Sequence, residues 1–223
     1  EIWLLAILTA GSIFLTTGLL VSVKYIDASL AILIFCTYPI IVLFVSMIID
    51  KEKIAIKIKL VFLLTFIGLF LVLGPSFESL KLTGVISAII ASIGASTIIL
   101  VNQKLSNRNI NPIHINAFTN LFNSIFFIIV LNLIYEINLN ITLEAWIMIL
   151  ISALCYAIAF FLQLLAIPRI GQSRTALLLY TEPIIAVLAS IILLKEILNL
   201  YQSIGAVIVI SSLVFATYHT NKN

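Results

Sequence analysis

Eight apolar runs of roughly 20 residues, separated by short polar connections, constrain the fold of this chain more than any other feature. The hydrocarbon core of a bilayer is about 30 Å thick, and an α-helix of about 20 apolar residues crosses it. Backbone polar groups in lipid must be satisfied within the protein, and the alternating pattern of a β-barrel is absent, so each run is predicted to be a transmembrane helix. The predicted spans are 2–23, 28–49, 58–74, 82–103, 113–135, 144–166, 173–194 and 200–218.

Composition leads to the same fold class. The chain is 63% hydrophobic and only 9% charged, whereas a soluble domain is about 25% charged. We therefore predict an all-α polytopic membrane protein. The two cysteines, Cys36 and Cys155, both lie inside apolar runs, so no disulfide framework is expected.

The positive charges are divided unequally between the two ends of the predicted helices. Cytoplasmic loops carry an excess of Lys and Arg, so the side with nine of the twelve is predicted to be cytoplasmic. This places the C-terminus in the cytoplasm and, in a bacterium, the chain in the inner membrane. The nine are Lys51, Lys53, Lys57, Lys59, Lys104, Arg108, Arg169, Arg174 and Lys222, and the other three are Lys24, Lys81 and Lys195.

Two parts of the chain resemble each other. Residues 24–52 align with residues 168–196 at an offset of 144 without a gap, and 11 of the 29 positions are identical. Matches of Ile with Ile are common in apolar runs, but a shared Thr-x-Pro-Ile-Ile with Lys-Glu at the same distance is not. Because the offset covers five predicted helices, an odd number, the copies are expected to face opposite ways across the membrane, as in many secondary transporters. The polar matches are Ser29/Ser173, Thr37/Thr181, Ser46/Ser190, Lys51/Lys195 and Glu52/Glu196.

The two copies are of unequal length. Residues 82–218 contain five predicted helices, whereas residues 1–74 contain only the last three of the first unit. Subtracting 144 from 82 gives a position before the chain, so we expect roughly 60 further residues ahead of Glu1 and ten helices in all, in two inverted five-helix repeats. The first residues also lack the basic region and the cleavage site of a signal peptide.

The repeated motif resembles the EamA-type transporters of the drug/metabolite transporter superfamily. The segment 166–214 carries the family pattern of small residues, Glu-Pro, an apolar helix with a Glu at its end, and a Gly in the next helix; here these are Glu182, Pro183, Glu196 and Gly205. The segment 23–54 repeats the pattern, except that Tyr38 stands where many members have Glu. The resemblance implies ten helices around a central cavity that is reached alternately from each side. It also implies small metabolite substrates, often amino acids or their derivatives, and often export.

Glu182 is the first candidate site residue. An acidic side chain near the bilayer centre costs about 2.5–3.5 kcal/mol on insertion scales, so its position needs a reason. Two readings stay open: a cavity carboxylate that binds a cationic group or a proton, and a structural acid that is bonded to a neighbouring helix. Pro183 and Pro39 follow Glu182 and Tyr38, and each is predicted to bend its helix and to free the carbonyl four residues earlier.

Polar residues on two further spans share helical faces. Asn116, Asn120 and Asn123 recur at helical spacing in the span 113–135, and Ser152, Tyr156 and Gln163 do so in 144–166. We predict that the bulky or mid-membrane members line the cavity and that the Ser and Thr hydroxyls join helices. The predicted cavity residues are Glu182, Tyr38, Asn120, Asn123, Tyr156 and Gln163. The small residues Gly84, Ala88, Ala91 and Ala95 predict close helix packing.

The sequence lacks the residues that several other classes of protein need for their function. Asp27 and Asp50 are the only aspartates and lie at span edges, so an intramembrane aspartyl pair is absent. His114 and His219 form no metal pattern with the cysteines, and no phosphate-binding loop of the G-x-x-x-x-G-K-[ST] type occurs. We therefore expect no enzyme activity, no metal, no cofactor and no nucleic-acid partner.

The sequence favours a secondary transporter that moves a small polar metabolite, such as an amino acid or a derivative, by alternating access. The alternatives are a non-transporting membrane scaffold, a channel-like protein, and an uptake carrier for a nucleoside-like metabolite such as S-adenosylmethionine. The expected partners are the substrate and the lipid bilayer, with coupling to a proton or cation and a homodimer as open alternatives. Substrate, direction and coupling ion do not follow from the sequence.

Overall fold

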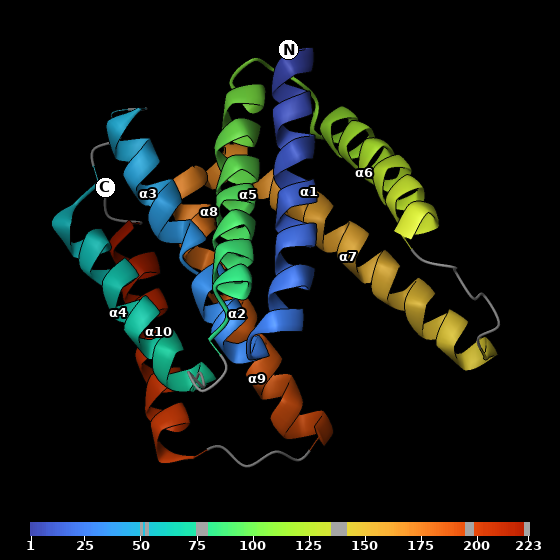
Figure 1. Cartoon of the computed structure of the whole chain (residues 1–223). Helices are drawn as coiled ribbons and strands as arrows, with labels where there is room; N and C mark the ends of the chain where they lie inside the picture. The colour runs from blue at the N-terminus through green and yellow to red at the C-terminus, as the bar shows by residue number, and fades with distance from the viewer. Residues whose placement is uncertain (50, 52–53, 75–79, 135–141, 195–198, 221–223) are drawn as a thin grey trace.

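The computed structural model describes the chain except residues 50, 52–53, 75–79, 135–141, 195–198 and 221–223 (Figure 1). The described residues form ten α-helices and no strand. The helices are α1 (Ile2–Tyr25), α2 (Ala28–Phe35), α3 (Tyr38–Ile48), α4 (Ile56–Leu73), α5 (Leu82–Ser106), α6 (Pro112–Ile134), α7 (Leu143–Ile170), α8 (Gln172–Leu178), α9 (Thr181–Leu194) and α10 (Leu200–Thr220).

All eight predicted spans are helical, and two of them are divided. The predicted span 28–49 becomes α2 and α3, and the predicted span 173–194 becomes α8 and α9. Among the described residues, six helical segments are long and apolar enough to cross a membrane, with α2 and α3 taken together as one of them. The chain is therefore an all-helical, multi-pass membrane protein.

The helix α7 extends four residues beyond the predicted span 144–166. The helix continues through Pro168 to Ile170, and the chain then turns at Gly171, whose φ is +83°. A membrane helix tolerates an internal proline when neighbouring groups satisfy the freed carbonyl. A positive φ is reached easily only by glycine, so Gly171 rather than Pro168 ends the helix.

The helix bounds follow the offset seen in the sequence. Shifting α1 by 144 residues gives 146–169, which lies inside α7, and shifting α4 gives 200–217, which lies inside α10. In Figure 1, α1 descends from the N-terminus whereas α7 rises toward α8, so these matched helices run in opposite directions.

Glycines bring α1 and α5 into close contact. A Cβ atom on Gly94 would lie 2.5 Å from the Gly11 carbonyl oxygen, and one on Gly18 would lie 2.6 Å from the Ser87 carbonyl oxygen. In lipid, where burying apolar surface drives little, such close packing supplies van der Waals contact instead. The predicted small-residue face of this segment is confirmed, since Ala88, Ala91 and Ala95 are buried and Gly84 abuts Ile26.

A second pair of glycines joins α4 to α10. A Cβ atom on Gly205 would lie 2.6 Å from the Gly68 carbonyl oxygen, and one on Gly68 would lie 2.7 Å from a methyl group of Val209. Around this contact lies a buried cluster that includes Phe62, Leu69 and Tyr180. The two helices therefore pack backbone to backbone, and Ile184 of α9 belongs to the cluster beside them.

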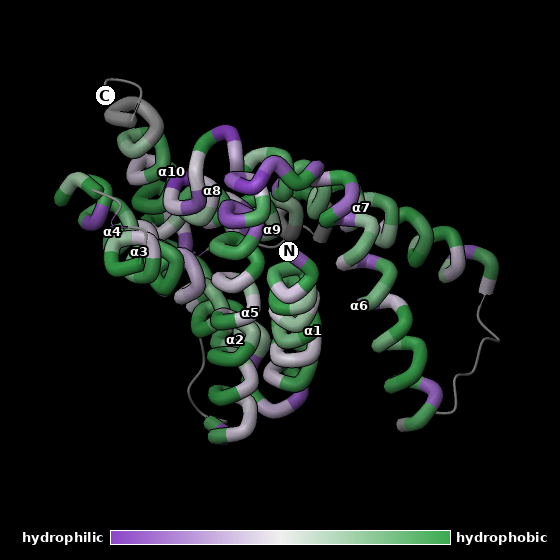
Figure 2. The backbone as a smooth tube through the Cα atoms, turned by 90° about the horizontal axis from the view of Figure 1, so that it is seen from above, coloured by the Kyte–Doolittle hydropathy of each residue, from purple (hydrophilic) through white to green (hydrophobic). Residues whose placement is uncertain are grey.

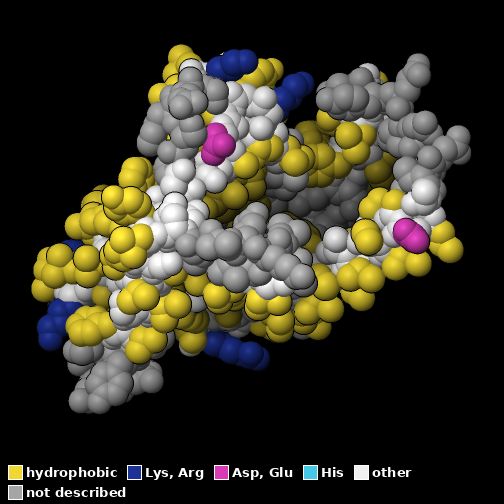
Figure 3. Space-filling model, turned by 90° about the horizontal axis from the view of Figure 1, so that it is seen from below, with side chains coloured by type: hydrophobic (Ala, Val, Ile, Leu, Met, Phe, Trp, Pro, Cys, Tyr) yellow, Lys and Arg dark blue, Asp and Glu magenta, His cyan; other side chains and the backbone are white. Residues whose placement is uncertain are grey.

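The helices α6 and α7 lie to one side of the pair formed by α1 and α5 (Figure 2). Most of their apolar side chains are exposed, among them Leu133 and Met148. The face seen from below shows the same character, with apolar side chains spread over it and Lys and Arg at its margin (Figure 3). Such a surface suits a lipid environment.

Candidate functional site

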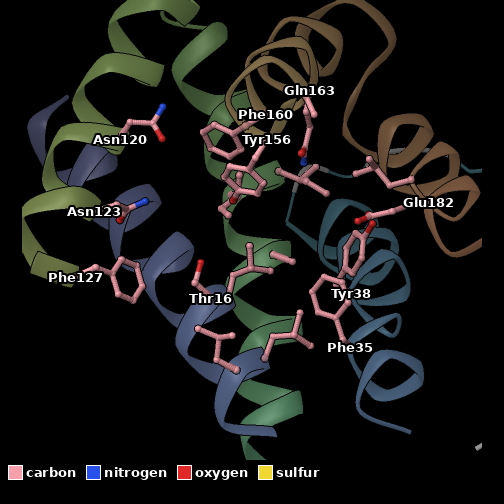
Figure 4. Close-up of a pocket in the computed structure, with 18 of the residues that line it drawn as sticks. Thr16, Phe35, Tyr38, Asn120, Asn123, Phe127, Tyr156, Phe160, Gln163 and Glu182 are labelled. Atoms are coloured by element: carbon pink, nitrogen blue, oxygen red, sulfur yellow. The ribbon is translucent and has the colours of Figure 1, made fainter. Parts of the chain in front are cut away.

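A cavity of about 960 Å³ opens between α6 and α7 on one side and α1, α3, α5 and α9 on the other (Figure 4). This volume is at the upper end of the range of about 300–1,000 Å³ that is usual for small-molecule sites. Its wall is mainly apolar and includes five aromatic rings. The polar and aromatic residues of the wall are Thr16, Phe35, Tyr38, Asn120, Asn123, Ser124, Phe127, Tyr156, Phe160, Gln163, Thr181 and Glu182.

The cavity lies beside two matched helix interruptions. The chain leaves the α-helix at Cys36 and Thr37 between α2 and α3, and at Leu179 and Tyr180 between α8 and α9. Pro39 lies in the first turn of α3, where the missing N–H of proline is tolerated. Pro183 occupies the corresponding turn of α9.

The two interruptions are stabilised in the same way. The Thr37 hydroxyl donates to the Ile34 carbonyl at 2.8 Å, and the repeat-matched Thr181 hydroxyl donates to the Leu178 carbonyl at 2.8 Å. The expectation that Pro183 leaves the Leu179 carbonyl free was wrong. That carbonyl accepts the Glu182 N–H at 3.1 Å, because the chain turns more tightly than an α-helix at this point.

Glu182 belongs to the first turn of α9, and its side chain is exposed to the cavity. The unsatisfied N–H groups of a helix N-terminus favour a negative charge, so this position lowers the cost of a carboxylate in the membrane. In Figure 4, Tyr38 and Glu182 lie on the same wall and Tyr156 lies on the facing one.

Tyr38 is a buried residue of this wall and is in contact with two neighbouring helices. Only 4% of the side chain is exposed, its ring lies 5.0 Å from the Phe35 ring, and its carbonyl accepts the Ser96 hydroxyl at 3.2 Å. The Tyr38 ring is thus packed against α2 and its backbone is bonded to α5, at a point where Tyr38 lines the cavity.

The facing walls come from α6 and α7. Tyr156 stacks on Phe160 with ring centroids 6.3 Å apart, and Gln163 lies about two turns further along α7. On α6, the Asn120 amide donates to Asn116 Oδ1 at 2.8 Å, and the Asn123 amide donates to the Ser12 hydroxyl at 2.6 Å. The second of these bonds joins α6 to α1.

The six side chains that the sequence singled out for a cavity all line this one, as do Phe35, Phe127 and Phe160, which it did not single out. A phenylalanine in an apolar span gives no signal that distinguishes a cavity wall from a lipid-facing surface. Thr181 also lines the cavity, and its match with Thr37 in the repeat gave no indication of this because Thr37 is not a lining residue. Within the described residues, no three His, Cys, Asp or Glu side chains gather as a metal site.

The family model of the EamA-like transporter family matches residues 82–218, which is more than half of the chain. The chain belongs to the EamA-like transporter family. This membership makes it a membrane transporter of the drug/metabolite transporter superfamily, a group whose members are generally not enzymes.

Comparison with solved structures supports the fold of this family member. One crystal structure superposes with a TM-score of 0.80 at 15% sequence identity, covering 97% of this chain and 76% of the other. At that identity the likeness concerns the fold alone. A comparison with curated proteins gave no match.

Proposed function

We propose that the protein is a secondary transporter that moves a small polar metabolite, such as an amino acid or a derivative, across the bacterial inner membrane by alternating access. The observation that carries this proposal is the cavity itself. It lies beside two interrupted helices, and its wall includes Glu182, three amides and two tyrosines. Broken helices next to a mid-membrane cavity are the arrangement in which inverted-repeat transporters bind their substrates.

A difference between the two ends of the molecule supports alternating access. The helices α3 and α8 pack together, and the Ser46 and Ser173 hydroxyls are 2.9 Å apart. The repeat pairs α3 with α9 and α8 with α2, so α2 and α9 form the corresponding pair at the other end. Among the described residues, α2 and α9 do not pack to a comparable extent. This is the pattern of a carrier that is closed at one end and open at the other.

The orientation follows from the charges. The end of α3 and the start of α8 lie on the side that holds most of the Lys and Arg residues, which we propose to be cytoplasmic together with the C-terminus. The packed end is then the cytoplasmic end, and the cavity faces outward.

We also propose that two inverted units of five helices form the carrier and that residues before Glu1 supply two of the ten. The faces of α1 and α7 support this. Gly11 and Gly18 of α1 pack on α5, whereas the matched α7 residues Cys155 and Leu162 are exposed. A helix equivalent to α5 would cover this face of α7.

Glu182 is our candidate for coupling to a proton or cation, since it is the one formally charged side chain among the described residues of the wall. A proton gradient imposed across proteoliposomes is expected to change the rate in the unaltered protein and not in Glu182→Gln. Full transport by Glu182→Gln with an unchanged pH profile would contradict the coupling role.

The proposed transport is tested by counterflow in proteoliposomes that contain the full-length protein. Liposomes preloaded with one unlabelled amino acid or amine are expected to accumulate the labelled compound above its external concentration. Saturable counterflow requires alternating access. A flux that is linear in substrate concentration and shows no counterflow would identify a channel. The absence of flux with every member of a broad metabolite panel would favour a non-transporting membrane scaffold.

A further inference from the structure

We propose that the cavity selects organic monocations, in which a protonated or quaternary ammonium is attached to an apolar or aromatic body, over zwitterions of the same skeleton. This inference rests on the proposed transport function and narrows its substrate class. Within amino-acid derivatives, it favours those that have lost the carboxylate over the parent amino acids.

The charge balance of the wall is the first argument. Glu182 is the sole formally charged side chain among the described lining residues, and no Lys or Arg is among them. A bound ammonium compensates the Glu182 carboxylate. A ligand carboxylate has no cation to pair with and is repelled by Glu182, and an unpaired charge inside a mainly apolar wall is costly.

The aromatic residues around Glu182 are the second argument. Tyr38 pairs with Phe35 at 5.0 Å, and Tyr156 stacks on Phe160 at 6.3 Å, so the rings come as two pairs from different helices. Figure 4 shows both pairs at the cavity, with the Tyr38 ring near Glu182. The face of an aromatic ring attracts a cation, and most strongly where water is excluded. Rings and carboxylate therefore favour the same kind of ligand.

The amides on α6 are the third argument, because a carboxylate would need them as donors. Each Asn amide has two N–H groups. The Asn123 amide already donates to Ser12, and the Asn120 amide already donates to Asn116. Each of these amides keeps one N–H group, but a neutral N–H group stabilises a negative charge less than a Lys or Arg would. The amides suit a hydroxyl or amide substituent better than a carboxylate.

The size of the cavity fits a ligand with a substantial body. About 960 Å³ is far more than an ammonium group fills, and the remaining wall is lined by residues such as Leu15, Ile98 and Phe127. Burial of an apolar body against them adds affinity without adding charge. The expected ligand has one positive centre at Glu182 and an apolar part directed toward α1 and α6.

The test uses three probes that share a phenylethyl skeleton: phenethylamine as the cation, phenylalanine as the zwitterion and phenethyl alcohol as the neutral compound. Their affinities for the full-length protein are measured by isothermal titration calorimetry at neutral pH. We expect the amine to bind at least tenfold more tightly than the other two. Equal or tighter binding of phenylalanine, or no binding of the amine, would overturn the inference.

Variants of the carboxylate and the ring test the assigned contacts. Glu182→Gln is expected to lower the amine affinity at least tenfold, to that of the alcohol, and Tyr156→Leu to lower it severalfold. Glu182→Asp keeps the charge and is expected to retain the preference at reduced affinity, which guards against a folding defect in Glu182→Gln. Glu144→Gln, which alters an exposed acid in the first turn of α7, is the matched control and should bind like the unaltered protein. An unchanged amine affinity in Glu182→Gln would also overturn the inference.

Transport of the same probes separates this inference from the proposed function. Counterflow of phenylalanine at the rate of the amine would overturn the proposed selectivity for cations but would agree with the proposed transport function. If the amine binds with the expected dependence on Glu182 but no probe shows counterflow, the proposed transport function is overturned and the proposed cation-binding site is supported.

Discussion

At the scale of single residues, Tyr180 provides a test of the stability of the protein and Tyr38 provides a test of its function. It lies at the interruption between α8 and α9, is 1% exposed, and packs against Phe62 with ring centroids 6.3 Å apart. Its hydroxyl is buried and has no hydrogen-bond partner among the described residues. A buried hydroxyl without a partner costs about 1–3 kcal/mol. Tyr180→Phe is therefore expected to leave the melting temperature of the detergent-solubilised protein unchanged or to raise it.

The matched control is Tyr38→Phe, in which the removed hydroxyl belongs to the cavity wall. This variant is expected to have the melting temperature of the unaltered protein and a changed affinity for the phenylethyl probes. A clear loss of stability in Tyr180→Phe would show that the Tyr180 hydroxyl has a bonded partner in the membrane.

At the scale of elements, the packing of α1 on α5 depends on glycine. A Cβ atom on Gly94 would lie 2.5 Å from the Gly11 carbonyl oxygen and 2.6 Å from the Leu15 backbone nitrogen. Backbone atoms in a helix cannot shift as a flexible side chain can, so Gly94→Ala must push the helices apart. Overpacking of this kind costs about 1–3 kcal/mol. A lower melting temperature is expected in Gly94→Ala, and little change in Ile93→Ala, which alters the exposed neighbour. Equal melting temperatures in the two variants would contradict tight packing.

The sequence predicted the elements better than their interruptions. Apolar length alone identified eight segments that are helical in the structure, because lipid leaves the backbone few alternatives to a helix. Pro39 and Pro183 indicated where two spans depart from a straight helix, whereas α7 continues through Pro168. The outcome depends on whether neighbours satisfy the freed carbonyl, and that is a tertiary property. The same limit applies to the cavity: polar residues such as Asn123 and Gln163 were identifiable by their cost in lipid, whereas Phe160 was not.

At the scale of the whole molecule, the proposed inverted repeat would relate the two ends of the proposed carrier by an exchange of conformations between its two units. The pair at positions 46 and 173 lies in the packed end, and the repeat maps it onto positions 190 and 29 at the other end. If the two units exchange conformations, as alternating access requires, contact at one pair should exclude contact at the other. Under the proposed alternating access, the two serine pairs are therefore expected to report the two states of one equilibrium.

Cysteine crosslinking tests this exchange. In a background of Cys155→Ser, which removes the exposed native thiol, Ser46→Cys with Ser173→Cys is expected to form a disulfide readily under mild oxidation. The two hydroxyl oxygens are 2.9 Å apart, so the replacing sulfurs start within bonding reach. The crosslink should abolish counterflow, and reduction should restore it, because a carrier fixed at one end cannot change states.

Ser29→Cys with Ser190→Cys is the matched pair. It should crosslink slowly where the first pair crosslinks quickly, and trapping either pair should protect the other from oxidation. Rapid crosslinking of both pairs in the same molecules would contradict alternating access and favour a structure closed at both ends.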